Sequence, residues 1–163
     1  MNKGKDKSPL EKTQASLQKL KENALKLLSR RDHSAQELKS KLGLRYLVSD
    51  ETFEELLRYL KKFDYLVRPE ILASRLVKAY QTQGRGARWI EGKLKTKGLS
   101  MPEVSDEEVK EIDAAKIFLA RKLRGKCLAE LTSDEKVKMM RSLVVRGFSH
   151  SLVADVMTDK NQN

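Results

Sequence analysis

The sequence predicts an all-α fold made of short amphipathic helices. Leu, Lys, Glu, Ala and Arg dominate its 163 residues, and β-branched runs are scarce. Only three prolines and eight glycines interrupt the chain, so helices meet few breakers. Apolar residues recur three and four positions apart, which is the period of a helix with one buried face. Because aromatic residues make up only 6%, we expect several short helices with a lean core.

Capping signals delimit three helices in the first part of the chain. Ser34 is followed three residues later by Glu37, which is the spacing of a capping box at a helix start. Ser49 is a second N-cap, and the run after it has apolar residues at i, i+3, i+4 and i+7. Gly43 suits the end of the middle helix. We expect these helices at about 17–30, 34–43 and 49–63.

The same signals continue to the end of the chain. Pro69 suits the first turn of a helix, and Gly84-Arg85-Gly86 ends that helix. A further capping box at residues 105–108 opens what should be the longest helix. Ser133 and Ser149 are N-caps of two more helices. We expect these helices at about 69–83, 86–97, 105–124, 133–146 and 149–157.

The short middle helices form a weak internal repeat. Residues 34–42 match residues 86–94 at an offset of 52, and residues 31–38 match residues 146–153 at an offset of 115. Helical units that cannot bury their faces alone stack into an elongated array. The expected division is a flexible basic tail (1–16), repeat 1 (17–66), a basic repeat 2 with a long third helix (67–126), a partial repeat 3 (127–158) and a polar tail (159–163).

No arrangement of residues that could perform catalysis is visible. His33 and His150 have no metal-ligand spacing, and surface exposure near capping turns accounts for both. The single Cys127 excludes an internal disulfide, and we expect it in the core. Gly84-Arg85-Gly86 is best interpreted as a turn, although its backbone could approach a phosphate at the following helix N-terminus. We therefore expect neither an enzyme nor a bound cofactor or metal.

The charge distribution predicts an anionic partner. The net charge is +11, from 34 basic and 23 acidic residues. Residues 68–98 hold eight basic residues against only Glu70 and Glu91, so this segment carries +6. No helix offers a set of base-reading side chains, which favours phosphate contact without sequence preference. The candidate binding residues are Arg75, Lys78, Arg85, Arg88, Lys93 and Lys97, with Arg121 and Arg124 as a second patch at the end of the long helix.

Two interpretations of Trp89 remain open. The ring can stack on a base or enter a groove of a partner, or it can pack between helices beside Ile90. The packing interpretation is favoured.

The chain has no apolar run near the roughly 20 residues that span a bilayer, and no signal peptide pattern. We expect a soluble, cytoplasmic monomer.

Three segments together resemble the RecX family of recombination regulators. The first is residues 24–38, with the sequence ALKLLSRRDHSAQEL. The second is residues 86–90, GARWI, with Leu94 and Lys97-Gly98 after it. The third is residues 146–149, RGFS. The resemblance covers about residues 22 to 158, and its segments are specific in combination rather than singly.

The resemblance implies three tandem three-helix repeats in a curved molecule. It implies a partner, the RecA recombinase filament on single-stranded DNA. A RecX-like protein would lie in the filament groove and suppress strand exchange, ATP hydrolysis and co-protease activity, and so act on homologous recombination, DNA repair and the SOS response. It would also bind DNA directly, with double-stranded DNA as a further ligand. The alternative is a stand-alone nucleic-acid-binding protein without sequence preference.

One segment departs from the family pattern. The family usually has a Gly-Tyr turn after the first unit, then paired acids and a Phe-Ala pair. Here Phe63-Asp64-Tyr65 is followed by Val67-Arg68, and Leu72-Ala73 replaces Phe-Ala. Two acids are absent and a cation is added, so this face becomes more basic.

Overall fold

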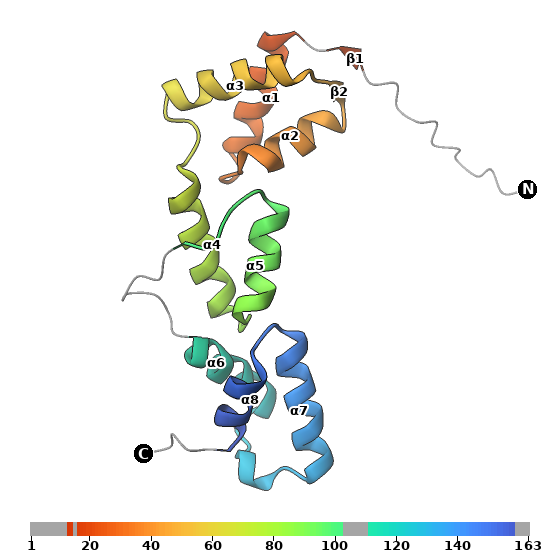
Figure 1. Cartoon of the computed structure of the whole chain (residues 1–163), viewed down its shortest axis with the longest axis vertical. Helices are drawn as coiled ribbons and strands as arrows, with labels where there is room; N and C mark the ends of the chain where they lie inside the picture. The colour runs from red at the N-terminus through yellow and green to blue at the C-terminus, as the bar shows by residue number, and fades with distance from the viewer. Residues whose placement is uncertain (1–12, 15, 103–110, 159–163) are drawn as a thin grey trace, which may run out of the picture. The chain divides into compact units, whose positions relative to one another are not determined.

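The computed structural model describes residues 13–14, 16–102 and 111–158, and nearly all regular structure in these ranges is helical (Figure 1). Eight α-helices lie in the described part of the chain, which confirms the all-α prediction. The chain separates into two compact units, Met1–Arg68 and Pro69–Asn163.

The first unit is built on three helices. These are α1 (Leu17–Leu28), α2 (Ala35–Gly43) and α3 (Asp50–Lys62), and α1 contacts both of the others. Their apolar faces meet in one core because the 3.6-residue period places these side chains on the inner side of each helix. The buried core residues are Leu20, Ala24, Leu38, Leu42, Phe53, Leu56, Leu57 and Leu60.

The helix starts in this unit are the predicted ones. Ser34 Oγ accepts from the Glu37 amide at 3.1 Å, and the Glu37 carboxylate accepts from the Ser34 amide at 3.3 Å. Ser49 Oγ accepts from the Thr52 amide at 3.2 Å. Both caps satisfy amides that have no partner inside their helix. The capping box at Ser34 and the cap at Ser49 are therefore confirmed.

Two features of the first unit were not predicted. A short parallel pairing joins β1 (Thr13–Gln14) to β2 (Tyr46–Leu47). His33, expected at the surface, is only 4% exposed. Its Nδ1 lies 2.8 Å from the carbonyl oxygen of Arg31, so the neutral ring donates a hydrogen bond there. The expectation of an exposed histidine was wrong, because the turn before α2 folds the ring inward.

The second unit contains five helices among its described residues. Pro69 is the first residue of its first helix, as predicted. A 3-10 turn, η1, precedes α7 and was not predicted. The elements are α4 (Pro69–Thr82), α5 (Ala87–Thr96), α6 (Glu111–Leu123), η1 (Leu128–Glu130), α7 (Ser133–Val145) and α8 (His150–Met157).

Helix α6 has a central place in this unit. It packs against α4 on one side and against α8 on the other, and α8 packs in turn against α7. Helix α8 therefore packs against both α6 and α7. The buried residues of this core are Ala114, Ala115, Phe118, Leu119, Leu143, Phe148, Val153, Val156 and Met157. Division of the unit into repeats 67–126 and 127–158 stays a proposal.

Some predicted boundaries differ in detail. Ser149 caps α8, as predicted, with its Oγ accepting from the Leu152 amide at 3.2 Å. The N-cap of α7 is Thr132, one residue before the predicted Ser133. The predicted capping box at residues 105–108 lies outside the described residues. Cys127, expected in the core, is exposed beside η1.

Candidate nucleic-acid interface

An open groove lies between α6 and α7 in the second unit. Its volume is about 790 Å³. One wall is the C-terminal half of α6 with the turn that follows, and the other is the face of α7 that carries Glu135, Lys138, Met139 and Ser142. The lining residues are Gln83, Phe118, Arg121, Lys122, Leu123, Arg124, Lys126, Leu131, Glu135, Lys138, Met139, Ser142 and Arg146.

The groove is strongly basic. Six of its thirteen lining residues are Lys or Arg, and only Glu135 is acidic. The amide and hydroxyl of Thr132 donate to Glu135 Oε2 at 2.9 and 3.1 Å. These hydrogen bonds, with smaller contributions from Lys126 and Lys138, lower the pKa of the Glu135 carboxyl. The Glu135 carboxylate stabilises the start of α7. Because it is the only acidic group in the lining, the groove has a large excess of positive charge.

Arg146 lines the groove beside the C-terminal end of α4. Its Nη1 donates to the carbonyls of Gln83 and Gly84 at 3.3 and 3.1 Å, and its guanidinium lies 4.2 Å from the ring centroid of Phe118. The carbonyls at a helix C-terminus lack partners inside the helix and attract cations. Arg146 therefore caps the C-terminal end of α4. Its guanidinium has further N–H groups that could donate to a ligand.

Arg121 adds a second cation at the same helix end. Its Nη2 donates to the Thr82 carbonyl at 3.0 Å. Burial, followed by repulsion from Arg85 and Arg121, lowers the pKa of the Arg146 guanidinium, which nevertheless stays protonated. Three guanidinium groups thus lie within electrostatic reach of one another. An oxyanion at this point would relieve their repulsion.

The structure places the predicted binding residues in several surroundings. Arg75 and Lys78 are exposed on α4, and Arg88 and Lys93 are exposed on α5. Lys97 is the half-buried C-cap of α5. None of these five lines the groove.

The other three predicted residues come together around the groove. Arg121 and Arg124 line it, and Arg85 is close enough to Arg146 to repel its charge. The predicted cations are therefore clustered most closely at the basic end of α6, which was predicted as the second patch.

Four cations of the groove are not among the predicted binding residues. Lys122 and Lys126 stand in the basic run at the end of α6, which was a usable signal. Arg146 was noted only as part of a motif, and Lys138 had no signal because its place in the groove depends on where α7 lies relative to α6.

Trp89 is engaged within the unit. Its ring meets that of Tyr80 edge-on, with centroids 5.1 Å apart. The Arg85 guanidinium and the Lys93 ammonium lie 4.2 and 5.4 Å from its centroid. The half-buried ring therefore anchors two of the predicted cations through cation–π contacts. This arrangement favours the packing interpretation of Trp89.

The start of α5 does not offer free amides to a phosphate. The amides of Gly86 and Arg88 donate to the carbonyls of Arg146 and Gly147 at 2.9 and 3.2 Å. The Ala87 amide donates to Glu111 Oε1 at 2.9 Å. The suggestion that a phosphate could bind this backbone was wrong, because other parts of the same unit already occupy its donors.

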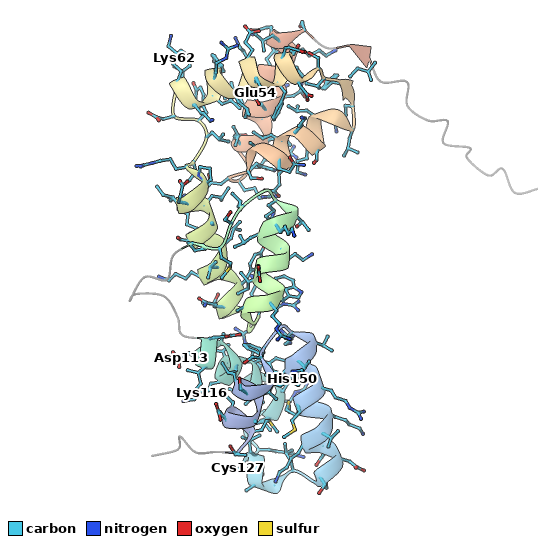
Figure 2. The ribbon with its side chains drawn as sticks, viewed as in Figure 1. Glu54, Lys62, Asp113, Lys116, Cys127 and His150 are labelled. Carbon is cyan, nitrogen blue, oxygen red and sulfur yellow. The ribbon has the colours of Figure 1, made fainter. Side chains whose placement is uncertain are left out.

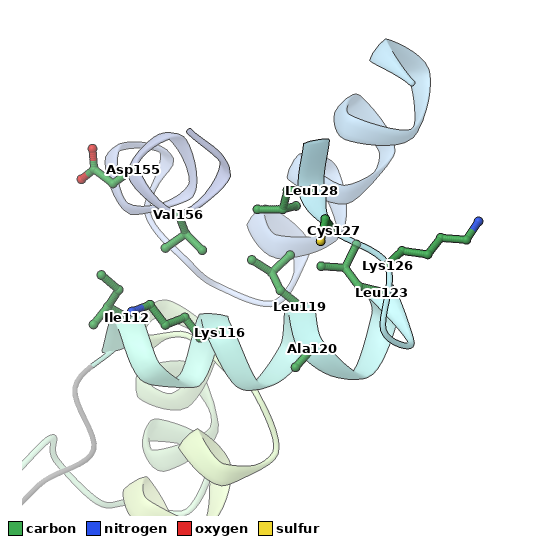
Figure 3. A pocket seen from close by; sticks show the side chains of 10 residues that line it. All are labelled: Ile112, Lys116, Leu119, Ala120, Leu123, Lys126, Cys127, Leu128, Asp155 and Val156. Carbon is green, nitrogen blue, oxygen red and sulfur yellow. The ribbon is translucent and has the colours of Figure 1, made fainter. Parts of the chain in front are cut away.

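A smaller cavity of about 330 Å³ lies between α6, η1 and α8 (Figure 3). Apolar side chains of α6, η1 and α8 face one another across it, and Cys127 lies at its edge. Lys116 lines this cavity and does not line the basic groove.

The described residues contain no group of three or more His, Cys, Asp or Glu side chains placed to hold a metal ion. Within the same ranges, no helix has the length and apolar character needed to cross a membrane.

Comparison with known proteins identifies the family. No family model matches the chain. The regulatory protein RecX of Herminiimonas arsenicoxydans is 31% identical over 150 residues, covering 88% of this chain and 94% of that protein. The chain belongs to the RecX family. The regulatory protein RecX of Escherichia coli O1:K1 is 28% identical over 85% of this chain and 89% of that protein.

A solved RecX structure has the same fold. The crystal structure of RecX from Lactobacillus salivarius matches with a TM-score of 0.66 at 20% sequence identity. The match covers 88% of this chain and 95% of that chain.

Two of the segments that resemble RecX sequences touch each other in this structure. The GARWI segment opens α5, and the RGFS segment joins α7 to α8. A Cβ added at Gly86 would lie 2.5 Å from the Gly147 carbonyl carbon and the Phe148 nitrogen. Phe148 itself is fully buried. These RecX-like residues therefore form a close backbone contact that fixes α5 against the α7–α8 turn.

Proposed function

We propose that this RecX-family protein is a negative regulator of homologous recombination and DNA repair, acting in the cytoplasm. It binds the RecA filament on single-stranded DNA and inhibits ATP hydrolysis, strand exchange and co-protease activity, and thereby limits the SOS response. The observation that carries the proposal is membership of the RecX family, whose relatives are named regulatory proteins. The recombinase itself is implied by the family and not by the chemistry of the groove.

The basic groove supplies a physical means of binding. Its cations suit a row of phosphates, and their binding would release counterions from the nucleic acid. An acidic face of the filament would satisfy the same charges. Inhibition then follows from steric and electrostatic contact, because a protein bound across neighbouring recombinase subunits resists the changes that accompany ATP hydrolysis. The candidate contacts are Arg75, Lys78, Arg85, Arg88, Lys93, Lys97, Arg121 and Arg124, now joined by Lys122, Lys126, Lys138 and Arg146.

The test is a titration of the protein into RecA assembled on single-stranded DNA, with ATP hydrolysis as the readout. We expect inhibition at well below one molecule per recombinase subunit. Absence of inhibition at such ratios would refute the proposal, since simple competition for DNA requires near-stoichiometric protein.

The second candidate function is nucleic-acid binding without a recombinase. The observation in its favour is the groove, where six cations face a single carboxylate that is already hydrogen-bonded. This candidate would be supported if inhibition appeared only when the protein concentration nearly equalled the concentration of DNA binding sites. Such inhibition should also disappear when free DNA is added.

A further inference from the structure

Three aromatic rings gather at the C-terminal end of α3 in the first unit. The Tyr59 and Phe63 centroids are 5.0 Å apart, and Tyr65 lies 6.2 Å from each of them. Phe63 is 52% exposed and Tyr65 is 46% exposed. We call these three residues the aromatic cluster.

The aromatic cluster is unusual for this chain. The sequence has only four Phe, four Tyr and one Trp, so a third of its aromatic residues are in this one place. Large aromatic side chains stabilise a protein mainly when buried, yet two of these three present much of their surface to water. Exposed contiguous apolar surface of this kind often marks a binding site.

Cations surround the cluster. The Lys21 ammonium lies 4.3 Å from the Tyr59 centroid, and the Lys62 ammonium lies 5.7 Å from the Phe63 centroid. Lys62 lies at this end of α3 (Figure 2). Residues 58–68 contain four basic residues and one acid, Asp64. The cluster is therefore an apolar surface with a positive border.

We propose that the aromatic cluster is a stacking site for an unpaired base of a single-stranded nucleic acid. Every base has a π-face that an exposed aromatic ring can accept, and neighbouring lysines meet the adjacent phosphates. A protein partner fits less well, because lysine is depleted from protein–protein interfaces. The inference extends the proposed function, since it rests on the protein meeting single-stranded DNA, and it assigns base contact to the first unit and phosphate contact to the groove of the second.

The test compares two fluorescent 15-mers in an anisotropy titration without any recombinase. One is oligo-dT, and the other is an abasic strand of the same length and charge. We expect the protein to bind oligo-dT about tenfold more tightly, which is in the range of one stacked base. The double variant Phe63→Leu/Tyr65→Leu should lose this preference and keep its affinity for the abasic strand, because leucine keeps apolar bulk and removes the π-face.

The controls separate stacking from other effects. Leu47→Ala changes another residue that is 57% exposed in the same unit and should keep the preference. The single variants Phe63→Leu and Tyr65→Leu, with circular dichroism to confirm folding, serve if the double variant is unstable. Equal binding of both strands by the wild-type protein, or a preserved preference in the folded variants, would overturn the inference. So would a variant that loses filament inhibition while it keeps the base preference, because the cluster would then contact protein.

Failure of the proposed function is a separate outcome. A wild-type protein that prefers oligo-dT over the abasic strand but never inhibits the recombinase would refute the regulatory proposal and support the stacking site.

Discussion

Gly147 lies against the backbone of Trp89. Its φ is +94°, and a Cβ at this position would overlap the Trp89 backbone nitrogen and lie 2.6 Å from the Trp89 Cβ. Only glycine has both the conformation and the absence of a side chain that this contact requires. The contact fixes the start of α5, and with it the Arg85–Trp89–Lys93 stack, against the turn that carries Arg146.

Gly147→Ala should therefore destabilise the second unit by about 3 kcal/mol, from overpacking and left-handed backbone strain together. The fluorescence of Trp89, the only tryptophan, reports urea unfolding of this unit. Gly92→Ala is the matched control, because nothing lies within 4 Å of a Cβ there and the residue is inside α5. It should stabilise the unit by roughly 0.5–1 kcal/mol. Similar effects of the two substitutions would show that the close contact between Gly147 and Trp89 does not determine the stability of the unit.

Asp64 has a φ of +52° in the turn after α3, a region that favours glycine. This conformation explains why glycine suits this position in the Gly-Tyr turn that RecX sequences usually have. Asp is among the few other residues that tolerate a positive φ. Asp64→Gly should raise the stability of the first unit by about 0.5 kcal/mol, whereas Asp64→Ala should lower it. Hydrogen exchange of the α1–α3 amides measures both. A glycine variant no more stable than the alanine variant would show that the turn is unstrained.

The pKa of His33 is lowered from its ordinary value of 6.5, first by burial and also by the charges of Arg31 and Lys41. Below pH 6.5 the unfolded chain binds more protons at this position than the folded one, so stability falls as the pH drops. We expect the first unit to lose stability from pH 6.5 downward to the folded-state pKa. Denaturant unfolding of the wild type and His33→Gln between pH 5.5 and 7.5 checks this. A variant with an unchanged pH slope would exclude His33 as the cause.

Lys138→Ala should weaken binding of single-stranded DNA and reduce the slope of log affinity against log salt by about 0.7, the share of one phosphate contact. Lys138 lines the basic groove on α7. Lys116→Ala removes the same charge from a position on α6 that does not line the groove, and it should leave the slope unchanged. The titration is repeated at several salt concentrations. An equal loss of DNA affinity and of salt slope in both variants would mean that net charge, and not the groove, determines binding.

Local features of this fold could be predicted from sequence. Ser34, Ser49 and Ser149 cap helices as expected, because a cap depends on residues within one turn. The apolar stripe of α3 is buried for the same reason.

Features that depend on distant parts of the chain could not be predicted. Lys138 lines the groove only because α7 lies across it from the end of α6. The amides at Gly86 and Ala87 have partners from residues 146 and 111, which no local pattern reveals. The inward position of His33 and the outward position of Cys127 likewise depend on how turns pack.

If the protein regulates the recombinase filament through the basic groove of its second unit, loss of groove cations should weaken inhibition. The most direct measurement is ATP hydrolysis by RecA on single-stranded DNA in the presence of Lys122→Glu/Lys138→Glu or of Lys116→Glu. Lys122 and Lys116 lie on the same helix, but only Lys122 lines the groove. We expect half-inhibition by the groove variant to need at least about tenfold more protein, from the loss of roughly 1.4 kcal/mol of binding free energy, while Lys116→Glu inhibits like the wild type. Inhibition by the groove variant at the wild-type concentration would show that the groove does not mediate regulation.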